Sequence, residues 1–214
     1  MIRDDFTAGN VPDQRIWVLL GSPRVLSGYL NLPSPGDGVR GRNKFAFDDA
    51  ARVTVIVHNG EGSVFITPYE ADTRPDAVNL PYLSIRYRQS QNRFDITVSD
   101  QDKAIAYAYI FNACKLIVKG SGENVVFTAV GKTTEGAEQP IEVATLKNPF
   151  YNQNVALYLF GGTTNIDYVE AGSGRELMST FMMESIMPAM TTLLALVMFI
   201  MVLRVLIRGV KRAV

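Results

Sequence analysis

The sequence has few of the residues that enzymes most often use: its 214 residues include one cysteine, Cys114, and one histidine, His58. A single cysteine excludes a disulfide within the chain. Because Cys114 lies in the apolar run 110–118, we predict a small buried side chain and not a reactive thiol. His58 precedes Asn59-Gly60 and has no second His or Cys near it, so we predict a loop residue and not a metal ligand.

Several short functional motifs are also absent. The sequence contains no G-x-x-x-x-G-K-[ST], H-E-x-x-H, C-x-x-C or G-x-S-x-G pattern. A Ser-His-Asp or Cys-His mechanism would therefore depend on His58 or Cys114 alone. We expect no catalytic residue, no cofactor and no small-molecule substrate.

Acidic residues are common, and some of them occur close together in pairs. We interpret these as turn, cap and surface groups: Asp4-Asp5, Asp48-Asp49 and Asp100/Asp102. A calcium site among Glu70, Asp72 and Asp76 stays open, although their spacing matches no calcium loop closely. We expect no metal ligand among the acids.

The formal net charge is zero, but the two signs are unevenly distributed. Residues 175–214 contain five basic and two acidic residues, so residues 1–174 carry a net charge of −3. A net negative charge on residues 1–174 does not indicate nucleic-acid binding by this part of the chain. The basic residues of the C-terminal part gather at its extreme end.

Residues 44–170 show a succession of strand patterns. The runs 83–88 and 93–98 alternate apolar with polar residues and flank Gln89–Asn92. This pattern predicts a hairpin with one face buried and the other exposed to water. The runs 52–58 and 63–67 flank Asn59-Gly60, an Asn-Gly step that predicts a second, tight hairpin. Further strands are predicted at 15–20, 124–130, 141–145 and 155–160.

This spacing favours a mainly β fold: an antiparallel, jelly-roll-like β-sandwich at 44–170. One segment departs from it, because Ser99–Asp102 resembles a helix cap and an apolar run follows as far as Lys119-Gly120. We prefer an embedded buried helix there over a long strand. Residues 1–43 are rich in Gly and Pro and predict an extended arm with a first strand. Residues 171–185 predict a linker and the start of a helix.

The C-terminal segment 186–214 contains the one long apolar run. No charge occurs from Ile186 to Leu203, and about 20 helical residues at ~1.5 Å each cover a ~30 Å hydrocarbon layer. We predict a single transmembrane helix from about Pro188 to Ile207. The residues predicted to form the membrane anchor are Pro188, Leu193, Leu194, Leu196, Val197, Phe199, Ile200, Val202 and Leu203. The basic residues predicted to lie at the interface or to face nucleic acid are Arg204, Arg208, Lys211 and Arg212.

The charged residues on either side of the apolar run predict how the helix is oriented in the membrane. Basic residues next to a membrane span resist translocation across the membrane. The C-terminal end is therefore expected on the cytoplasmic side, and the β domain on the opposite side. The first residues, Met1–Phe6, have no apolar segment of signal-peptide length. Either a leader has been removed, or the membrane is not an ordinary cell boundary. A virion with a lipid vesicle beneath its protein shell satisfies the second condition.

The first functional hypothesis is therefore a non-catalytic, single-pass structural subunit of a membrane-containing virus. Its expected partners are the lipid bilayer, other copies or neighbouring shell subunits, and packaged nucleic acid at the basic end. The alternative is a cell-envelope or surface-layer-type protein, or an accessory subunit of a larger membrane complex, with its β domain outside the cell. An enzyme on a membrane tether is the third.

Overall fold

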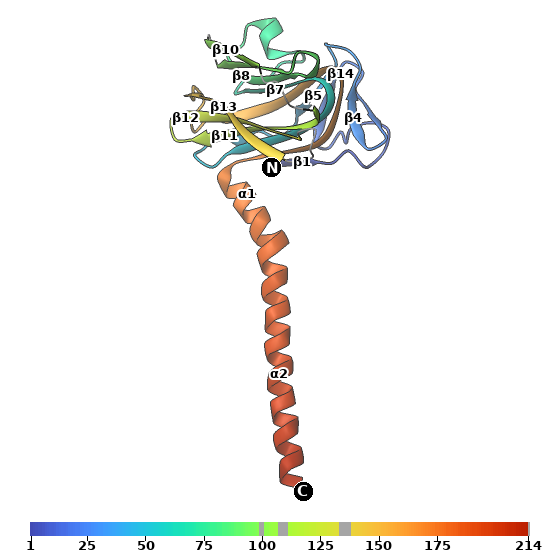
Figure 1. The fold of residues 1–214 in the computed structure, drawn as a ribbon, viewed down its shortest axis with the longest axis vertical. Coiled ribbons are helices and arrows are strands. Elements are labelled where there is room, and N and C mark those ends of the chain that lie inside the picture. Colours follow the sequence, from blue (N-terminus) through green and yellow to red (C-terminus); the bar gives the residue numbers. More distant parts are fainter. Residues whose placement is uncertain (99–100, 107–110, 133–137, 214) are drawn as a thin grey trace. The chain divides into compact units, whose positions relative to one another are not determined.

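The computed structural model describes residues 1–98, 101–106, 111–132 and 138–213. It describes the side chains of these residues except 101–106, 111–112, 132, 138–139, 141–142 and 202–213. The chain divides into two units, Met1–Arg175 and Glu176–Val214. Strands form the first unit, and a helix forms the second (Figure 1).

The first unit is built almost entirely of β-structure. Its strands are β1 (Ile2–Asp4), β2 (Trp17–Leu20), β3 (Arg24–Leu26), β4 (Tyr29–Leu32), β5 (Gly38–Gly41), β6 (Phe45–Ala46), β7 (Arg52–Thr67), β8 (Leu83–Arg88), β9 (Arg93–Val98), β10 (Gln101–Ala106), β11 (Phe111–Ser121), β12 (Asn124–Lys132), β13 (Glu138–Lys147) and β14 (Asn154–Gly172). Two short 3₁₀ turns, η1 (Pro75–Val78) and η2 (Gln89–Gln91), lie between them.

The long strands β7 and β14 organise this unit. They pair antiparallel with each other from Thr67↔Ala156 to Arg52↔Gly172, with register shifts between Gly162 and Tyr168. The first part of β7 pairs on its other side with β11, and its last part pairs with β8. Each half of the β7·β14 pair therefore belongs to a different sheet.

Two antiparallel sheets result. One follows the order β10-β9-β8-β7-β14-β5-β2, and the other follows β13-β12-β11-β7-β14, continued by β4 and β1 along the free edge of β14. Buried side chains from both sheets form one core cluster. The predicted mainly β, antiparallel sandwich is confirmed.

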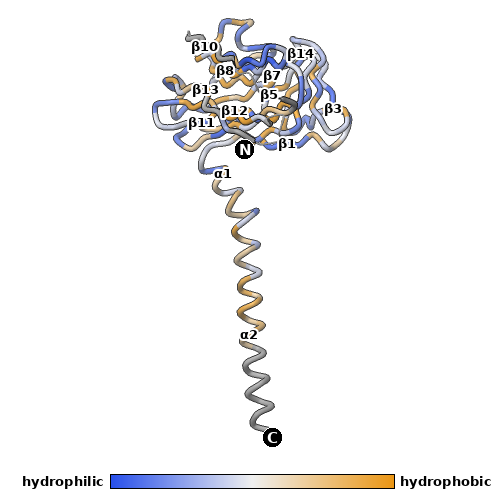
Figure 2. The backbone as a smooth tube through the Cα atoms, in the orientation of Figure 1, coloured by the Kyte–Doolittle hydropathy of each residue, from blue (hydrophilic) through white to orange (hydrophobic). Residues whose placement is uncertain are grey.

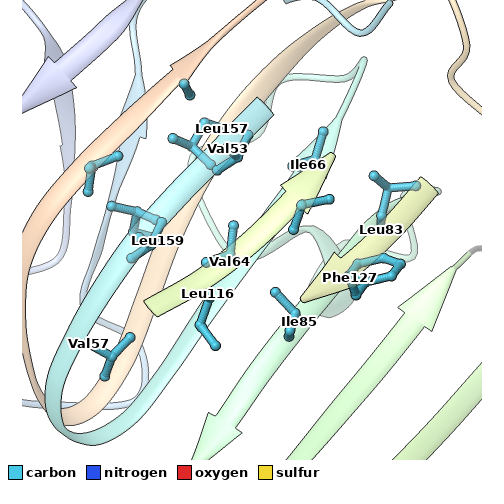
Figure 3. Close-up of a cluster of buried hydrophobic side chains, with 14 of the residues drawn as sticks. Val53, Val57, Val64, Ile66, Leu83, Ile85, Leu116, Phe127, Leu157 and Leu159 are labelled. Carbon is cyan, nitrogen blue, oxygen red and sulfur yellow. The ribbon is translucent and has the colours of Figure 1, made fainter. Parts of the chain in front are cut away.

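Apolar side chains that alternate along the strands fill the space between the sheets. Figure 3 shows Val64 of β7 and Ile85 of β8 near Leu116 of β11 and Phe127 of β12, and all four are at most 2% exposed. Fully burying a side chain of this kind stabilises a fold by roughly 1.5–3 kcal/mol. The period-2 pattern thus sets which side of each strand faces the core.

The hairpin predicted at 83–98 is confirmed. Strands β8 and β9 pair in register from Leu83↔Val98 to Arg88↔Arg93. Asn92 closes the turn in the left-handed conformation, with φ of 47°, and its backbone N–H donates to the Gln89 carbonyl. Among residues other than glycine, Asn is one of those found most often in this conformation.

The hairpin predicted at Asn59-Gly60 is wrong. Residues 52–67 form the single strand β7, and Gly60, with φ of 77°, bends the strand without reversing it. Strand β14 pairs with β7 on both sides of the bend. Long-range pairing therefore prevails over the local turn preference of the Asn-Gly step.

The embedded helix predicted after Ser99 is also wrong where the structure describes the segment. Residues 101–106 form β10 and residues 111–121 form β11; residues 99–100 and 107–110 of that prediction lie outside the described part. Along β11, Cys114, Leu116 and Val118 are buried, whereas Lys119 is exposed. A strand with partners on both sides buries this alternating set more completely than a helix would.

The interpretation of residues 1–43 as an extended arm needs correction. They form β1 to β5, and Trp17, Leu30 and Leu32 are each 0% exposed. The Gly- and Pro-rich turns separate short strands that pair with the free edge of β14 or with each other. This region completes the sandwich.

Residues 171–174, predicted as a linker, continue the sandwich instead. Ala171 is fully buried and Gly172 ends β14. The Gly174 N–H donates to Asp48 Oδ1 at 3.0 Å, and a Cβ at Gly174 would collide with Ala50. Glycine permits this close approach, so here it is a packing residue and not a flexible one.

The helix consists of α1 (Gly174–Phe181), a π-helical turn η3 (Met182–Ile186) and α2 (Met187–Ala213). The π-turn ends two residues before Pro188, a residue type that interrupts helices. In the wider turn the Met187 N–H donates to the Met182 carbonyl. Since proline removes one N–H and crowds the preceding turn, this local widening allows the helix to continue through Pro188.

The bend in β7 gives a first testable prediction. Gly60→Ala should destabilise the protein by about 3 kcal/mol, because Cβ would meet the Thr163 carbonyl in a left-handed backbone. Urea unfolding of the full chain in detergent micelles, followed by fluorescence of the sole tryptophan, Trp17, measures the effect.

Gly28→Ala is the matched control. Gly28 has φ of 81° but nothing within 4 Å of a Cβ, so we expect only the conformational cost of about 1–2 kcal/mol. Equal losses in the two variants would show that the β7·β14 contact at the bend contributes nothing.

Candidate functional site

The first candidate site is the apolar helix. Residues Gly174–Met201 are long and apolar enough to cross a membrane, and none of the apolar window is buried in the structure. Figure 2 shows the hydrophobic colour along the described part of α2. The side chains of the predicted anchor residues Leu193, Leu194, Leu196, Val197, Phe199 and Ile200 are 44–62% exposed. A helix that is apolar all round needs either a protein core or lipid around it.

The remaining predicted anchor and basic residues also lie on α2. These are Val202, Leu203, Arg204, Arg208, Lys211 and Arg212, whose side chains are outside the described ones. Pro188 occupies the second position of α2. The helix thus brings all the predicted residues onto one continuous element.

The threonine hydroxyl groups of α2 are hydrogen-bonded within the helix. Thr191 Oγ1 donates to the Met187 carbonyl at 2.9 Å, and Thr192 Oγ1 donates to the Pro188 carbonyl at 3.0 Å. Polar groups that bond to their own helix need no further partner in hydrocarbon. These threonines are compatible with a lipid environment.

The second candidate site is a groove in the β-sandwich, which the sequence analysis missed. It lies where β7 and β14 bend. A hollow of about 510 Å³ is lined by Pro33, Pro35, Gly60, Glu61, Gln89, Ser90, Gly162 and Thr163. A smaller hollow of about 110 Å³ adjoins it and is lined by Pro35, Glu61, Ser63, Arg74, Arg86, Phe160, Gly161 and Gly162. Because the two share Pro35, Glu61 and Gly162, we treat them as one groove with a large and a small compartment.

The floor of the groove is conformationally unusual. Thr163 adopts the left-handed conformation with φ of 56°, which is rare for a β-branched residue. A Cβ at Gly161 would contact the Thr164 side chain at 2.7 Å, so glycine is required for the close approach. Gln89 Oε1 accepts the Gly60 N–H at 2.8 Å and joins the β8–β9 turn to this floor. Strained backbone of this kind gathers at functional sites more often than elsewhere.

The small compartment carries positive charge. Arg86 donates from Nε to Ser63 Oγ at 2.9 Å, and its Nη2 lies 4.0 Å from Asp76. Asp76 is held more closely by Arg74, at 2.5 Å. Burial, together with the nearby cations Arg74 and Arg88, lowers the pKa of Arg86 below its ordinary value. Arg86 is only partly neutralised, by Asp76 at 4.0 Å and by Asp95, which faces it across the β8–β9 pair.

The loop that carries Arg74 is fixed over the outer face of the sheet. The Tyr158 hydroxyl accepts the Ala71 N–H at 2.7 Å, and Thr67 Oγ1 donates to the Pro81 carbonyl at 2.7 Å. The Arg74 guanidinium lies 5.7 Å from the centre of the Phe65 ring. Arg74 is thereby positioned at the groove by contacts on both sides of the loop.

The residues weighed in the sequence analysis take other roles. Cys114 is fully buried, as predicted. His58 is an exposed residue of β7 and not of a turn, with its ring stacked 4.9 Å from that of Tyr29. The carboxylate of Asp4 accepts the Trp17 indole N–H at 2.8 Å, and that of Asp48 accepts backbone N–H groups. Asp100 and the side chain of Asp102 are outside the described part.

Two of the three acids of the open calcium hypothesis, Glu70 and Asp76, form ion pairs instead. Glu70 forms ion pairs with Arg40 at 2.8 Å and Lys44 at 3.3 Å, and Asp76 pairs with Arg74. No group of three or more potential ligands gathers among the residues that the structure describes.

A glycine spacing at 36–41, Gly36-Asp-Gly-Val-Arg-Gly, matches the dinucleotide-binding pattern G-x-G-x-x-G. That pattern functions between a strand and the N-terminus of a helix. Here it spans a turn and strand β5, and a Cβ at Gly38 would meet the Leu159 carbonyl at 2.5 Å. The glycine serves the close approach of β5 to β14.

No protein-family model matches the chain, and no curated protein matches it in sequence. Solved structures do match. The metal-free exoplasmic/lumenal domain of VIP36 is 11% identical with a TM-score of 0.56, covering 80% of this chain and 90% of that one. A non-specific endo-β-1,3(4)-glucanase is 10% identical with a TM-score of 0.55, covering 79% and 88%.

A third similar structure is the metal-free lectin I-B4 from Griffonia simplicifolia, 10% identical with a TM-score of 0.52, covering 80% of this chain and 97% of that one. Identities at this level show the fold alone. The β unit has the jelly-roll fold of these lectins and glucanases.

The buried cysteine gives a second prediction. Burial raises the pKa of Cys114 to about 12, so the thiol stays protonated and shielded at pH 8. We expect less than about 1% of the labelling rate by a disulfide reagent in the folded protein compared with the urea-unfolded protein. Comparable rates in the two states would contradict the burial of this thiol.

Proposed function

We propose that the protein is a membrane-anchored, non-catalytic structural subunit, with the jelly-roll unit on one side of a bilayer. The observation that carries this proposal is the exposed apolar helix Gly174–Met201. Leaving such a surface in water is unfavourable by about 25 cal/mol per Å², and a bilayer removes that cost. Lipid is therefore the first proposed partner.

The charges define the span. Between Glu184 and Arg204 lie nineteen uncharged residues, which cover about 28 Å as a helix. This matches the ~30 Å hydrocarbon layer. Arg204 would extend its side chain towards the head groups, and Arg208, Lys211 and Arg212 would lie at or beyond the interface. The β unit would then lie on the side opposite the basic end.

The non-catalytic role is supported by the composition of the groove. Glycoside hydrolysis generally uses two carboxyl groups on either side of the scissile bond. Among the described residues, Glu61 is the sole acid that lines the groove; it borders both compartments, and Arg74 and Arg86 line the small one. One carboxylate fits binding better than this two-carboxylate chemistry.

The assembly that we propose is a virion with an internal membrane, with the β unit in the shell. The basic end of the helix would face packaged nucleic acid, where the release of counterions favours Lys and Arg. A cell-envelope or surface-layer-type protein, or an accessory subunit of a larger membrane complex, is the alternative with the same anchor.

Carbohydrate binding by the β unit is a second candidate function. It is favoured by the groove and by the nature of the structural neighbours, which include a lectin and a glucanase. A sugar-binding groove is compatible with a structural role, because a surface subunit can bind a glycan without catalysing a reaction on it. Carbohydrate binding is a proposal separate from membrane anchoring, and binding measurements can test it.

Membrane integration gives a third prediction. Changing Leu194 and Val197 together to Asp should release the protein from membranes, since each charge near the centre of a span costs about 2.5–3.5 kcal/mol. Alkaline carbonate extraction of membranes from expressing cells measures the released fraction.

The matched control changes Met178 and Phe181 to Asp. This pair has the same spacing and comparable exposure but precedes Glu184, so the variant should stay in the membrane pellet. Release of the unaltered protein by carbonate would contradict the membrane proposal. Retention of the Leu194→Asp/Val197→Asp variant would contradict the proposed span.

The virion proposal gives a fourth prediction. Native particles that contain the protein should float with lipid and hold nucleic acid, and ultraviolet irradiation should crosslink the protein to it. Replacing Arg208, Lys211 and Arg212 by Gln should abolish crosslinking and leave flotation unchanged. Recovery of the native protein only as a lone monomer in a cell membrane would contradict this assembly.

A further inference from the structure

The groove in the β unit combines two environments that differ in chemistry. Its large compartment, about 510 Å³, is within the ~300–1,000 Å³ range of small-molecule sites. Its small compartment, about 110 Å³, contains Arg74 and Arg86. A ligand that fills both would need a body with polar and apolar faces and, at one end, a negative charge.

The large compartment fits a ring that carries hydroxyl groups. Pro33 and Pro35 supply flat apolar surfaces, Gly60 and Gly162 leave space above the floor, and Glu61, Gln89 and Ser90 supply acceptors and donors. Hydroxyl groups can both donate to a carboxylate and accept from an amide. This mixed lining therefore suits a sugar ring better than a purely apolar ligand.

An extended peptide fits less well. A peptide that adds to a sheet needs a free row of backbone N–H and C=O groups. At the groove floor, β7 and β14 pair with each other, as at Gly62↔Gly161, and β7 also pairs with β8, as at Glu61↔Arg88. The Gly60 N–H is bound by Gln89. The backbone there is already occupied.

The small compartment attracts an anion. Four arginines outnumber three acids, Glu61, Asp76 and Asp95, around this compartment. Arg74 pairs with Asp76, whereas Arg88 and Arg93 share Asp95 at 2.7 and 2.5 Å. Arg86 has the more distant Asp76 contact, at 4.0 Å, and its Nε bonds only a neutral hydroxyl. A partly buried guanidinium with incomplete charge balance gains from an added carboxylate or sulfate.

We propose that this groove binds an acidic saccharide, with a sugar ring in the large compartment and its carboxylate or sulfate group against Arg86. The inference rests on the second candidate function, carbohydrate binding, and adds the class of sugar and the residue that selects it. Arg86 is the specificity residue, and Glu61, Gln89 and Ser90 bind ring hydroxyls.

The test uses the full chain in detergent and two probes of matched size: an oligogalacturonide and its methyl ester, which keeps the sugars and removes the charges. Titration calorimetry measures both affinities. We expect the acid to bind about tenfold or more tightly than the ester, because a charge-assisted hydrogen bond distinguishes them. Arg86→Ala should remove this preference by weakening the acid far more than the ester, whose carbonyl loses only a hydrogen bond from a charged donor to a neutral acceptor.

Arg93→Ala is the matched control. Arg93 also pairs with an aspartate on this face but does not line the groove, so the preference for the acid should persist. Arg86→Lys keeps the charge and should retain part of the preference. Glu61→Gln should weaken binding of the ester, because a neutral amide oxygen accepts hydrogen bonds from ring hydroxyls less strongly than a carboxylate does. Fluorescence of Trp17 verifies the folding of each variant.

The outcomes separate the two claims. Equal binding of acid and ester would overturn the acidic specificity and leave carbohydrate binding intact. Binding of neither probe would overturn both. Succinate that binds as tightly as the oligogalacturonide would reveal a site for small anions and overturn the saccharide proposal. Unchanged preference in a folded Arg86→Ala variant would overturn the assignment of Arg86.

Discussion

The antiparallel pairing of β7 with β14 is the constraint on which the β unit depends. These two strands stay paired through a bend, and each half of the pair joins a different sheet. The short strands β1, β4, β5 and β6 attach along the other edge of β14. Without the shared pair, the two sheets would have no common hydrogen-bonded element, and the inward side chains of one sheet would not face those of the other.

The groove is a consequence of the same bend. Bending two paired strands, here with shifts of register, needs residues that accept unusual backbone angles and close contacts: Gly60, Gly161 and Thr163. The bend leaves a hollow beside the β8–β9 turn and the Pro33–Pro35 turn. Side chains that enter this hollow come from distant parts of the sequence, so a feature of the fold becomes a place where ligands can be recognised. The arginines at one end of the groove favour negatively charged ligands.

The helix, in contrast, is stabilised by interactions between residues that are close in the sequence. Its backbone hydrogen bonds are internal, Thr191 and Thr192 bond to their own helix, and the π-turn accommodates Pro188. Each of these solutions involves residues within five positions of one another. The helix is therefore complete as a local structure, and what it lacks is a surrounding for its apolar surface. This is why the proposed anchor depends on the bilayer and not on contacts of the β unit.

The sequence alone determined the features with local causes: the apolar helix of residues 186–203, the β8–β9 hairpin with its Asn92 turn, and the burial of Cys114 in an apolar run. Tertiary structure decided the rest. The Asn59-Gly60 step turned out to be a bend because β14 pairs on both sides of it, and residues 101–106 and 111–121 became strands because edges of neighbouring strands were available. The groove joins Pro35, Glu61, Arg86 and Gly162. Their proximity arises from long-range pairing, which no local pattern of residues encodes.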